Sequence, residues 1–246
     1  MSKTMQRAAH QALDEVIAGM MGKQVQLNTR LARTEGIPAT SLSKNMPELK
    51  QQLKQSVIEK QREMFPEYKY NDELRNIWRD LIEYFTGNYK ELNPNKGLLF
   101  VGPIGCGKTT IFQILKAALK GKQEQFNAVG TWTLADEYQS VGMKFIGKYL
   151  FNEEILRVYN RETPINLFID DLGSEAIVSH SYGDKRNVVN DIILRRYELY
   201  KEYGVKTHGA TNLTDDLLFP RYEPKVVDRM KEMFNIVYLS NGSWRK

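Results

Sequence analysis

The stretch GLLFVGPIGCGKTTIFQIL, residues 97–115, decides the fold of this chain. Its centre, residues 102–109, fits the pattern G-x-x-x-x-G-K-[ST], placed where a buried strand leads through a tight loop into a helix. Such a loop directs its backbone N–H groups at the phosphates of a nucleoside triphosphate. The stretch therefore predicts the first strand, phosphate loop and first helix of an α/β nucleotide-binding fold.

Each residue type in this loop has a physical role toward phosphate. Gly102, Gly105 and Gly107 allow backbone turns that a Cβ would obstruct. We expect Lys108 to reach the β- and γ-phosphates and the Thr109 hydroxyl to bind Mg²⁺. The helix that follows adds the positive end of its dipole. The candidate ATP-binding residues are Gly102, Pro103, Ile104, Gly105, Cys106, Gly107, Lys108, Thr109 and Thr110.

A second buried run, residues 165–169, ends in two consecutive acids. We expect Asp170 to hold Mg²⁺ beside the loop, together with Thr109. Asp171 stands where a base would orient the attacking water. Most hydrolysing proteins with this arrangement carry glutamate there, and aspartate is one methylene shorter. Slow hydrolysis is therefore one interpretation of Asp171.

A polar residue follows the predicted strand 205–210. In a parallel sheet that strand lies beside the one that ends at Asp170, so Asn212 is a candidate partner of the γ-phosphate or the attacking water. The alternative is a helix N-cap, a role that Thr214 serves equally well. His208, inside the strand, is interpreted as a packing residue rather than a catalytic base.

Strand and helix patterns alternate from about residue 96. The predicted strands are residues 97–101, 126–131, 165–170, 205–210 and 235–239, and the predicted helices are 108–120, 134–150, 184–203, 215–218 and 223–233. This alternation is typical of a parallel sheet between two helical layers, with the ligand at the carboxyl ends of the strands. The predicted fold class is an α/β P-loop NTPase with a five-stranded parallel sheet.

The first ninety residues differ in character from the rest. Helical patterns cover residues 8–21, 47–65 and 71–85, with a breaker stretch at 36–41 and a turn-rich linker at 87–95. The apolar stripe of the third helix is interpreted as a packing face rather than as an aromatic nucleic-acid surface. We expect residues 1–90 to form a small helical region that binds a partner, and residues 91–246 to form the nucleotide domain.

Composition narrows the class of protein. The chain has 246 residues, a formal net charge of +5 and one cysteine, so an internal disulfide and a cysteine-based zinc site are excluded. The basic excess permits contact with nucleic acid without demonstrating it. No apolar run has the length of a membrane span. We expect a soluble cytoplasmic protein with no membrane contact.

Four ordered motifs, residues 102–109, 168–175, 210–213 and 227–230, together resemble the AAA+ ATPases of the DnaC/DnaI helicase-loader group. The transposition helper IstB is a close relative of that group. The resemblance implies that Asn212 is sensor 1 and that Arg229 is an arginine finger acting on ATP held by a neighbouring subunit. Without the resemblance, local pairing of Arg229 with Asp228 or Glu232 would be the simpler interpretation.

Further features of the resembled group apply here as expectations. The chain ends just after its last predicted strand, so we expect no C-terminal helical lid, as in the loaders. The group inserts a helix that faces a central channel, and residues 133–149 occupy that place. Lys144 and Lys148 share one face of this predicted helix and either meet DNA phosphates or form a solvated pair.

Several functions fit these observations. The leading one is an ATP-dependent loader of a replicative DNA helicase that binds ATP, Mg²⁺ and single-stranded DNA as a homo-oligomer. An IstB-like helper of a transposase is the alternative from the same fold. A small-molecule kinase would need a basic lid, for which Lys185, Arg186, Arg195 and Arg196 are the candidates. The last is a nucleotide-dependent switch that hardly hydrolyses ATP.

Overall fold

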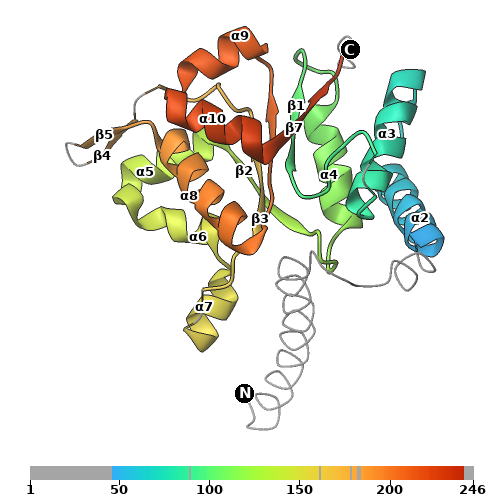
Figure 1. Ribbon diagram of the computed structural model, residues 1–246, viewed down its shortest axis with the longest axis horizontal. Coiled ribbons are helices and arrows are strands. Elements are labelled where there is room, and N and C mark those ends of the chain that lie inside the picture. Colours follow the sequence, from blue (N-terminus) through green and yellow to red (C-terminus); the bar gives the residue numbers. More distant parts are fainter. Residues whose placement is uncertain (1–45, 89, 161, 178, 182–183, 241–246) are drawn as a thin grey trace, which may run out of the picture. The chain divides into compact units, whose positions relative to one another are not determined.

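The computed structural model describes residues 46–240, except 89, 161, 178, 182 and 183 (Figure 1). The chain divides into two units, residues 1–46 and 47–246, and the fold below is that of the second. The predicted helix at 8–21 and the breaker at 36–41 lie outside the described residues. No helix in the described part of the chain is long and apolar enough to span a bilayer.

The centre of the fold is a five-stranded sheet. Its strands are β1 (Gly97–Val101), β2 (Phe126–Gly130), β3 (Asn166–Asp170), β6 (Thr207–Thr211) and β7 (Phe234–Tyr238), in the order β2-β3-β6-β1-β7. All four pairings are parallel, so every strand ends at the same edge. The predicted five-stranded parallel sheet is confirmed, and β6 separates the loop strand β1 from the acid strand β3.

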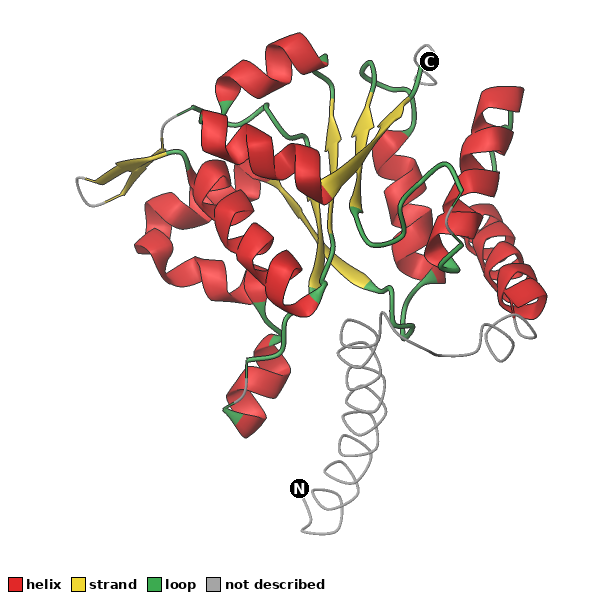
Figure 2. Ribbon diagram, in the orientation of Figure 1, coloured by secondary structure: helices red, strands yellow, loops and turns green. Residues whose placement is uncertain are grey.

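Helices cover both faces of the sheet (Figures 1 and 2). One layer contains α2 (Met46–Met64), α3 (Asp72–Phe85) and α4 (Lys108–Ala118), and the other contains α5 (Thr131–Val141), α6 (Gly147–Leu150), α8 (Val188–Tyr203) and α10 (Pro224–Met233). Two short helical segments, α9 (Asp215–Leu218) and η2 (Phe219–Arg221), lead from β6 to α10.

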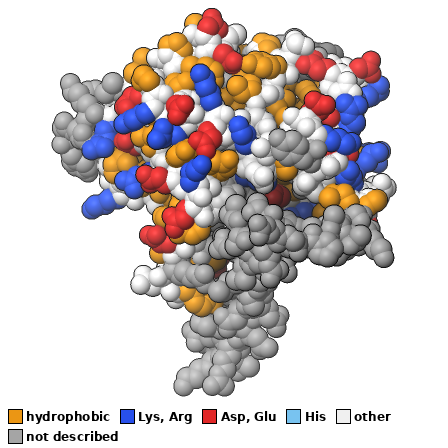
Figure 3. Space-filling model, in the orientation of Figure 1, with side chains coloured by type: hydrophobic (Ala, Val, Ile, Leu, Met, Phe, Trp, Pro, Cys, Tyr) orange, Lys and Arg blue, Asp and Glu red, His pale blue; other side chains and the backbone are white. Residues whose placement is uncertain are grey.

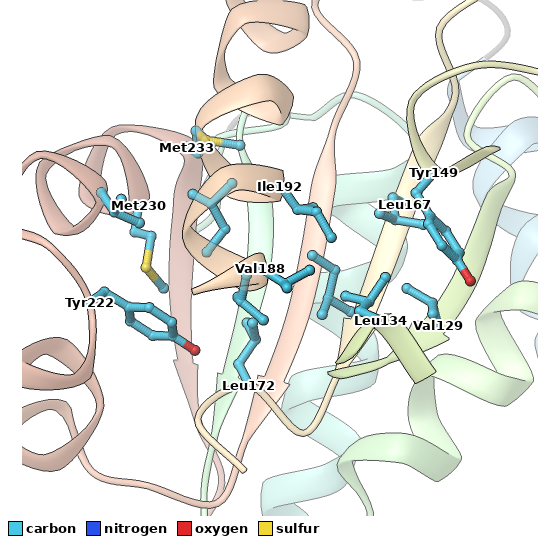
Figure 4. Close-up of a cluster of buried hydrophobic side chains, with 14 of the residues drawn as sticks. Val129, Leu134, Tyr149, Leu167, Leu172, Val188, Ile192, Tyr222, Met230 and Met233 are labelled. Carbon is cyan, nitrogen blue, oxygen red and sulfur yellow. The ribbon is translucent and has the colours of Figure 1, made fainter. Parts of the chain in front are cut away.

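A largely aliphatic core joins the sheet to the α8 layer (Figure 4). Leu167 of β3 packs there with Ile192 of α8, Met230 of α10 and Leu134 of α5, all of them buried. Burying apolar surface contributes about 25 cal/mol per Å². This core therefore stabilises the packing of α8 and α10, which carry Arg195 and Arg229, against β3, which ends at Asp170.

The opposite core joins the sheet to α2, α3 and α4. Trp78 and Leu81 of α3 and Val57 of α2 pack with Phe100 of β1 and Phe112 of α4. The packing interpretation of the stripe on residues 71–85 is therefore confirmed. The sequence analysis placed a boundary at residue 90. Because α2 and α3 share this core with the sheet, contacts do not separate the chain there, and the compact unit begins at Pro47.

The predicted helix at 134–150 is wrong as a continuous element. The structure has α5, the 3-10 segment η1 (Gly142–Ile146) and α6, followed by α7 (Glu153–Tyr159). Gly142 ends α5 with φ of +62°, a conformation that favours glycine. Lys144 and Lys148 consequently lie on different segments, and Lys148 pairs with Glu137. The predicted single helix that carries both lysines is therefore replaced by two shorter segments.

A small hairpin precedes α8. Its strands are β4 (Ser179–Ser181) and β5 (Asp184–Arg186), which the sequence analysis missed and assigned in part to the helix. The helix begins at Val188, where the Asn187 side chain accepts a hydrogen bond from the backbone N–H of Asn190. The three-residue strands are too short to show a period-2 pattern, so the helical pattern behind them concealed the hairpin.

Candidate nucleotide-binding site

The loop between β1 and α4 takes the conformation that its glycines predicted. Gly105 and Gly107 have φ of +84° and +98°, and Gly107 directly precedes the first turn of α4. Gly102 is required for a different reason. A Cβ there would lie 2.5 Å from the carbonyl oxygen of Leu239, so the loop and the segment after β7 approach too closely for a side chain.

Lys108 is buried in the loop and bonded to oxygen on several sides. Its ammonium donates to the carbonyl oxygens of Gly102 at 2.7 Å and Pro103 at 2.8 Å, and to Asn212 Oδ1 at 2.8 Å. The Asn212 contact joins residues 104 positions apart in the sequence. The cation and the candidate sensor amide therefore belong to one polar cluster.

Thr109 and Asp170 face each other across the sheet edge. The Thr109 hydroxyl lies 3.0 Å and 3.2 Å from the two carboxylate oxygens of Asp170. Burial raises the pKa of the Asp170 carboxyl above its usual value, against the opposing effect of the Thr109 hydrogen bond. A hydroxyl and a carboxylate are hard oxygen donors of the kind that Mg²⁺ prefers, and Mg²⁺ takes its remaining ligands from water and phosphate.

The protein side of that cation site is small. No group of three or more His, Cys, Asp or Glu side chains in the described residues has a metal-binding arrangement. Two oxygen ligands fit Mg²⁺, which is bound through one or two carboxylates plus substrate phosphates. The donor set of Thr109 and Asp170 therefore fits a cation that arrives with a nucleotide.

Asp171 has a backbone conformation that few side chains tolerate. Its φ is +56°, and its carbonyl oxygen accepts hydrogen bonds from the hydroxyls of Thr131 at 3.0 Å and Ser174 at 2.7 Å. Its carboxylate accepts from the Asn212 amide at 3.0 Å. Aspartate adopts left-handed backbone more readily than most residues, so this turn suits Asp171. Asn212 thereby bridges Lys108 and Asp171.

A cavity of about 520 Å³ opens over Lys108, Thr109, Asp171 and Asn212. This volume is within the usual range for a small-molecule site. The loop lines one side and Asp171 with Asn212 another. The third side consists of Glu67, Tyr68 and Lys69, from the turn between α2 and α3, which the sequence analysis missed. Tyr68 is held in place because its hydroxyl accepts from the Trp78 indole at 3.2 Å.

Arg229 does not line this cavity. It lies on α10, where its guanidinium carbon is 4.9 Å from the centre of the Tyr197 ring of α8. Its pairing with Asp228 is confirmed as a contact of 3.5 Å, whereas Glu232 pairs with Lys201. Any action of Arg229 on a nucleotide in this cavity would therefore come from another copy of the chain.

His208 lies in β6, the strand beside β1, and is fully buried. Its Nδ1 accepts from the backbone N–H of Leu98 at 3.2 Å, and its ring packs among Tyr84, Phe85, Phe112 and Phe126. Burial, together with the nearby charges of Lys206 and Arg196, lowers the pKa of His208 well below its usual value. The interpretation of His208 as a packing residue is confirmed.

Comparisons with known proteins give a family match to part of the chain and several similar solved structures. Residues 82–156 match the family model described as an AAA domain. The fold, a five-stranded parallel sheet with a phosphate loop after β1, is that of a P-loop NTPase. The strand order, with β6 between the loop strand and the acid strand, accounts for the contact between Asn212 and both Lys108 and Asp171.

Similar solved structures include the following three proteins. The DnaC helicase loader is 22% identical, with 71% of this chain and 94% of that chain covered and a TM-score of 0.47. DnaI is 18% identical, with 73% and 89% covered and a TM-score of 0.49. AMPPCP-bound DnaA from Aquifex aeolicus is 14% identical, with 70% and 48% covered and a TM-score of 0.47. No curated protein matches the sequence.

Proposed function

We propose that this chain is an ATPase that binds ATP and Mg²⁺ in the cavity above the loop, assembles with further copies on single-stranded DNA, and loads a replicative helicase. One observation carries the nucleotide part. Lys108, Thr109, Asp170, Asp171 and Asn212, from three different strand ends, converge on one edge of the sheet. Their chemistry matches the cation, metal ligands, base and sensor of phosphoryl transfer to water.

Each residue has a role in this proposal. Lys108 binds phosphate oxygens, while Thr109 and Asp170 hold Mg²⁺, which would neutralise phosphate charge. Asp171 orients the attacking water, and its Asn212 partner reports the γ-phosphate. The nucleoside end of ATP lies toward Glu67, Tyr68 and Lys69, the remaining wall of the cavity.

The loader role is supported by the four ordered motifs and by the division of the chain. The helices α2 and α3 are committed to the core of the nucleotide unit, which begins at Pro47. Within the predicted partner-binding region 1–90, residues 1–45 are therefore the segment that we assign to helicase binding. The basic balance of the chain accords with a nucleic-acid partner.

The kinase interpretation loses one of its four candidate cations. Arg196 is fully buried, and it donates to Thr207 Oγ1 at 2.9 Å and to the carbonyl oxygens of Ile165 at 2.6 Å and Lys206 at 2.8 Å. A side chain used in this way joins the amino ends of β3 and β6. These bonds engage all three guanidinium nitrogens, and they hold the buried side chain at the amino ends of the strands, away from the carboxyl edge where a phosphoryl acceptor would bind.

Co-purification tests the partner. The full chain with ATP should form a stable complex with a hexameric replicative helicase, and a variant lacking residues 1–45 should lose that complex while still binding ATP. Recovery with a transposase on duplex DNA, and not with the helicase, would replace the proposal by the IstB-like function. A phosphorylated small molecule in place of free phosphate would identify a kinase.

Single-stranded DNA binding gives a second test. If two or three phosphates are contacted, affinity should fall about tenfold between 50 and 200 mM salt, because each contact releases condensed counterions. Fluorescence anisotropy of a labelled oligonucleotide measures this slope. Binding that does not change with salt would contradict a phosphate-lined channel.

A further inference from the structure

Arg229 rests on an aromatic ring rather than in a close ion pair. Its guanidinium lies 4.9 Å from the Tyr197 ring centre, within the range of a cation–π contact, and its side chain is 36% exposed. Its polar contacts in the described structure are 3.4 Å to the Lys225 carbonyl oxygen and 3.5 Å to Asp228. Both lie beyond the usual hydrogen-bond distance, so they hold the guanidinium weakly.

Tyr197 is fixed across the two helices. Its hydroxyl donates to Glu232 Oε2 at 2.7 Å, and Lys201 donates to Glu232 Oε1 at 2.8 Å. These hydrogen bonds, from Lys201 first and Tyr197 second, lower the pKa of the Glu232 carboxyl, which stays ionised. The ring under Arg229 is therefore held by a charged acceptor on α10, the helix that also carries Arg229.

Charged side chains of both signs lie around Arg229 and Tyr197. Figure 3 shows Lys and Arg side chains interleaved with Asp and Glu on the face that α8 and α10 present in this view. On such a surface a guanidinium has carboxylates within reach, and a bidentate pair would occupy its in-plane N–H groups. A cation–π contact instead holds the guanidinium without a bidentate carboxylate, so its N–H groups stay available for another acceptor.

We propose that Tyr197 is a positioning residue for Arg229. The ring holds the guanidinium through the cation–π contact, so that its N–H groups are presented to the triphosphate bound by a second copy of this chain. This inference rests on the proposed function, in which copies of the chain assemble, and on the trans-acting role that the resemblance implies for Arg229. Tyr197 acts only through Arg229 and touches no nucleotide itself.

Two substitutions at one position separate the ring from the hydroxyl. Tyr197→Leu removes the aromatic face and should lower kcat for ATP hydrolysis about two- to fivefold at protein concentrations that saturate assembly, the size expected of an exposed cation–π contact. KM for ATP should stay unchanged, because the nucleotide cavity is intact. Tyr197→Phe keeps the face and should stay within about twofold of the wild type, since it keeps the cation–π surface.

Tyr200→Leu is the matched control. Tyr200 lies on the same helix, with its ring centre 6.3 Å from that of Tyr197, and it has no recorded contact with Arg229. Its loss should leave kcat unchanged. Thermal unfolding of all three variants shows whether each is folded at the assay temperature.

Mixing subunits tests the direction of the effect. Asp171→Asn subunits keep Tyr197 and Arg229 but lack the base, so adding them to Tyr197→Leu subunits should raise turnover per Tyr197→Leu subunit. The same addition should raise turnover of Arg229→Ala subunits. No rise in the first mixture, with a rise in the second, would overturn the role of Tyr197.

The failure of this inference differs from failure of the proposed function. Wild-type kcat in Tyr197→Leu, with a large loss in Arg229→Ala, would refute positioning by the ring and leave the trans-acting arginine intact. Equal losses in the Leu and Phe variants would assign the positioning to the hydroxyl and overturn the cation–π argument. Wild-type kcat in Arg229→Ala would remove the arginine itself from the reaction.

Discussion

The carboxyl edge of the sheet and the surface of α8 and α10 hold their cations in opposite ways. Lys108 has three oxygen partners at 2.7 to 2.8 Å, whereas Arg229, among the described residues, has polar contacts of 3.4 and 3.5 Å above an aromatic ring. One cation belongs to a complete polar cluster, and the other is offered outward. We expect ATP binding to be a property of one chain, and fast hydrolysis to require two.

The largest expected effect tests the outward cation. Arg229→Ala should leave ATP affinity within about twofold and lower assembly-dependent turnover about 10³-fold, the low end for a missing arginine in trans. Phosphate release at protein concentrations that allow self-association measures this. Lys225→Ala removes another cation from α10 and should be near wild type. Wild-type turnover in Arg229→Ala would mean that both regions act within one chain.

The second prediction concerns the inward cation. Lys108→Ala should lower ATP affinity at least about 100-fold, because charge-assisted hydrogen bonds to phosphate are lost. Titration with a fluorescent ATP analogue measures the affinity at a protein concentration where the chain is monomeric. Lys120→Ala, just beyond α4, is the charge control. Unchanged affinity would show that the cluster at the sheet edge is structural.

Asp171→Asn should separate binding from hydrolysis. Asparagine tolerates φ of +56° and keeps an oxygen for Asn212, so ATP binding should persist, while turnover falls about 100-fold for want of a base. Single-turnover phosphate release checks this. Wild-type turnover would rule out Asp171 as the base.

Asp171→Glu is the companion variant. It restores the methylene that most hydrolysing proteins of this arrangement have. A large gain in turnover would show that the native chain is slow because of its shorter acid, and that it resembles a nucleotide-dependent switch.

The smallest expected effect is the contribution of the buried His208 to the pH dependence of folding stability. The pKa of His208 is lowered in the folded state, so the unfolded chain binds the additional proton, and stability should fall as pH drops below about 6.5. One proton corresponds to about 1.4 kcal/mol per pH unit at most. Urea unfolding of the wild type and His208→Leu between pH 7.5 and 5.5 measures the difference. Equal pH dependence in both would assign the effect to other groups.

Local patterns predicted the loop, the five strands of the central sheet and most helices. The positive φ of Gly105 and Gly107 is a property of the loop itself. Residues 108–118 repeat apolar positions at the three- and four-residue spacing of a helix. The break of the predicted helix also had a local signal, because glycine commonly ends a helix by taking positive φ, as Gly142 does. Its signal was outweighed by the apolar periodicity on both sides of it.

Contacts between distant segments were not predictable in the same way. Thr131 and Ser174 hold the Asp171 carbonyl from positions 40 residues before and three after it, and Tyr68 reaches the cavity from a turn before β1. Hydroxyl residues at such places have no distinctive spacing. The Tyr197 ring beneath Arg229 is likewise visible only once α8 packs on α10.

The sequence by itself determined the phosphate loop, the parallel sheet and the residues that meet at its edge. Loop conformation and periodicity are short-range properties, and parallel strands bring their ends together whatever fills the space between them. Only the tertiary structure decided that Lys108 is enclosed and Arg229 half-buried over the Tyr197 ring, and that α2 and α3 belong to the nucleotide unit. Which side chains share a core or a ring depends on packing between elements far apart in the chain, and no local pattern contains that information.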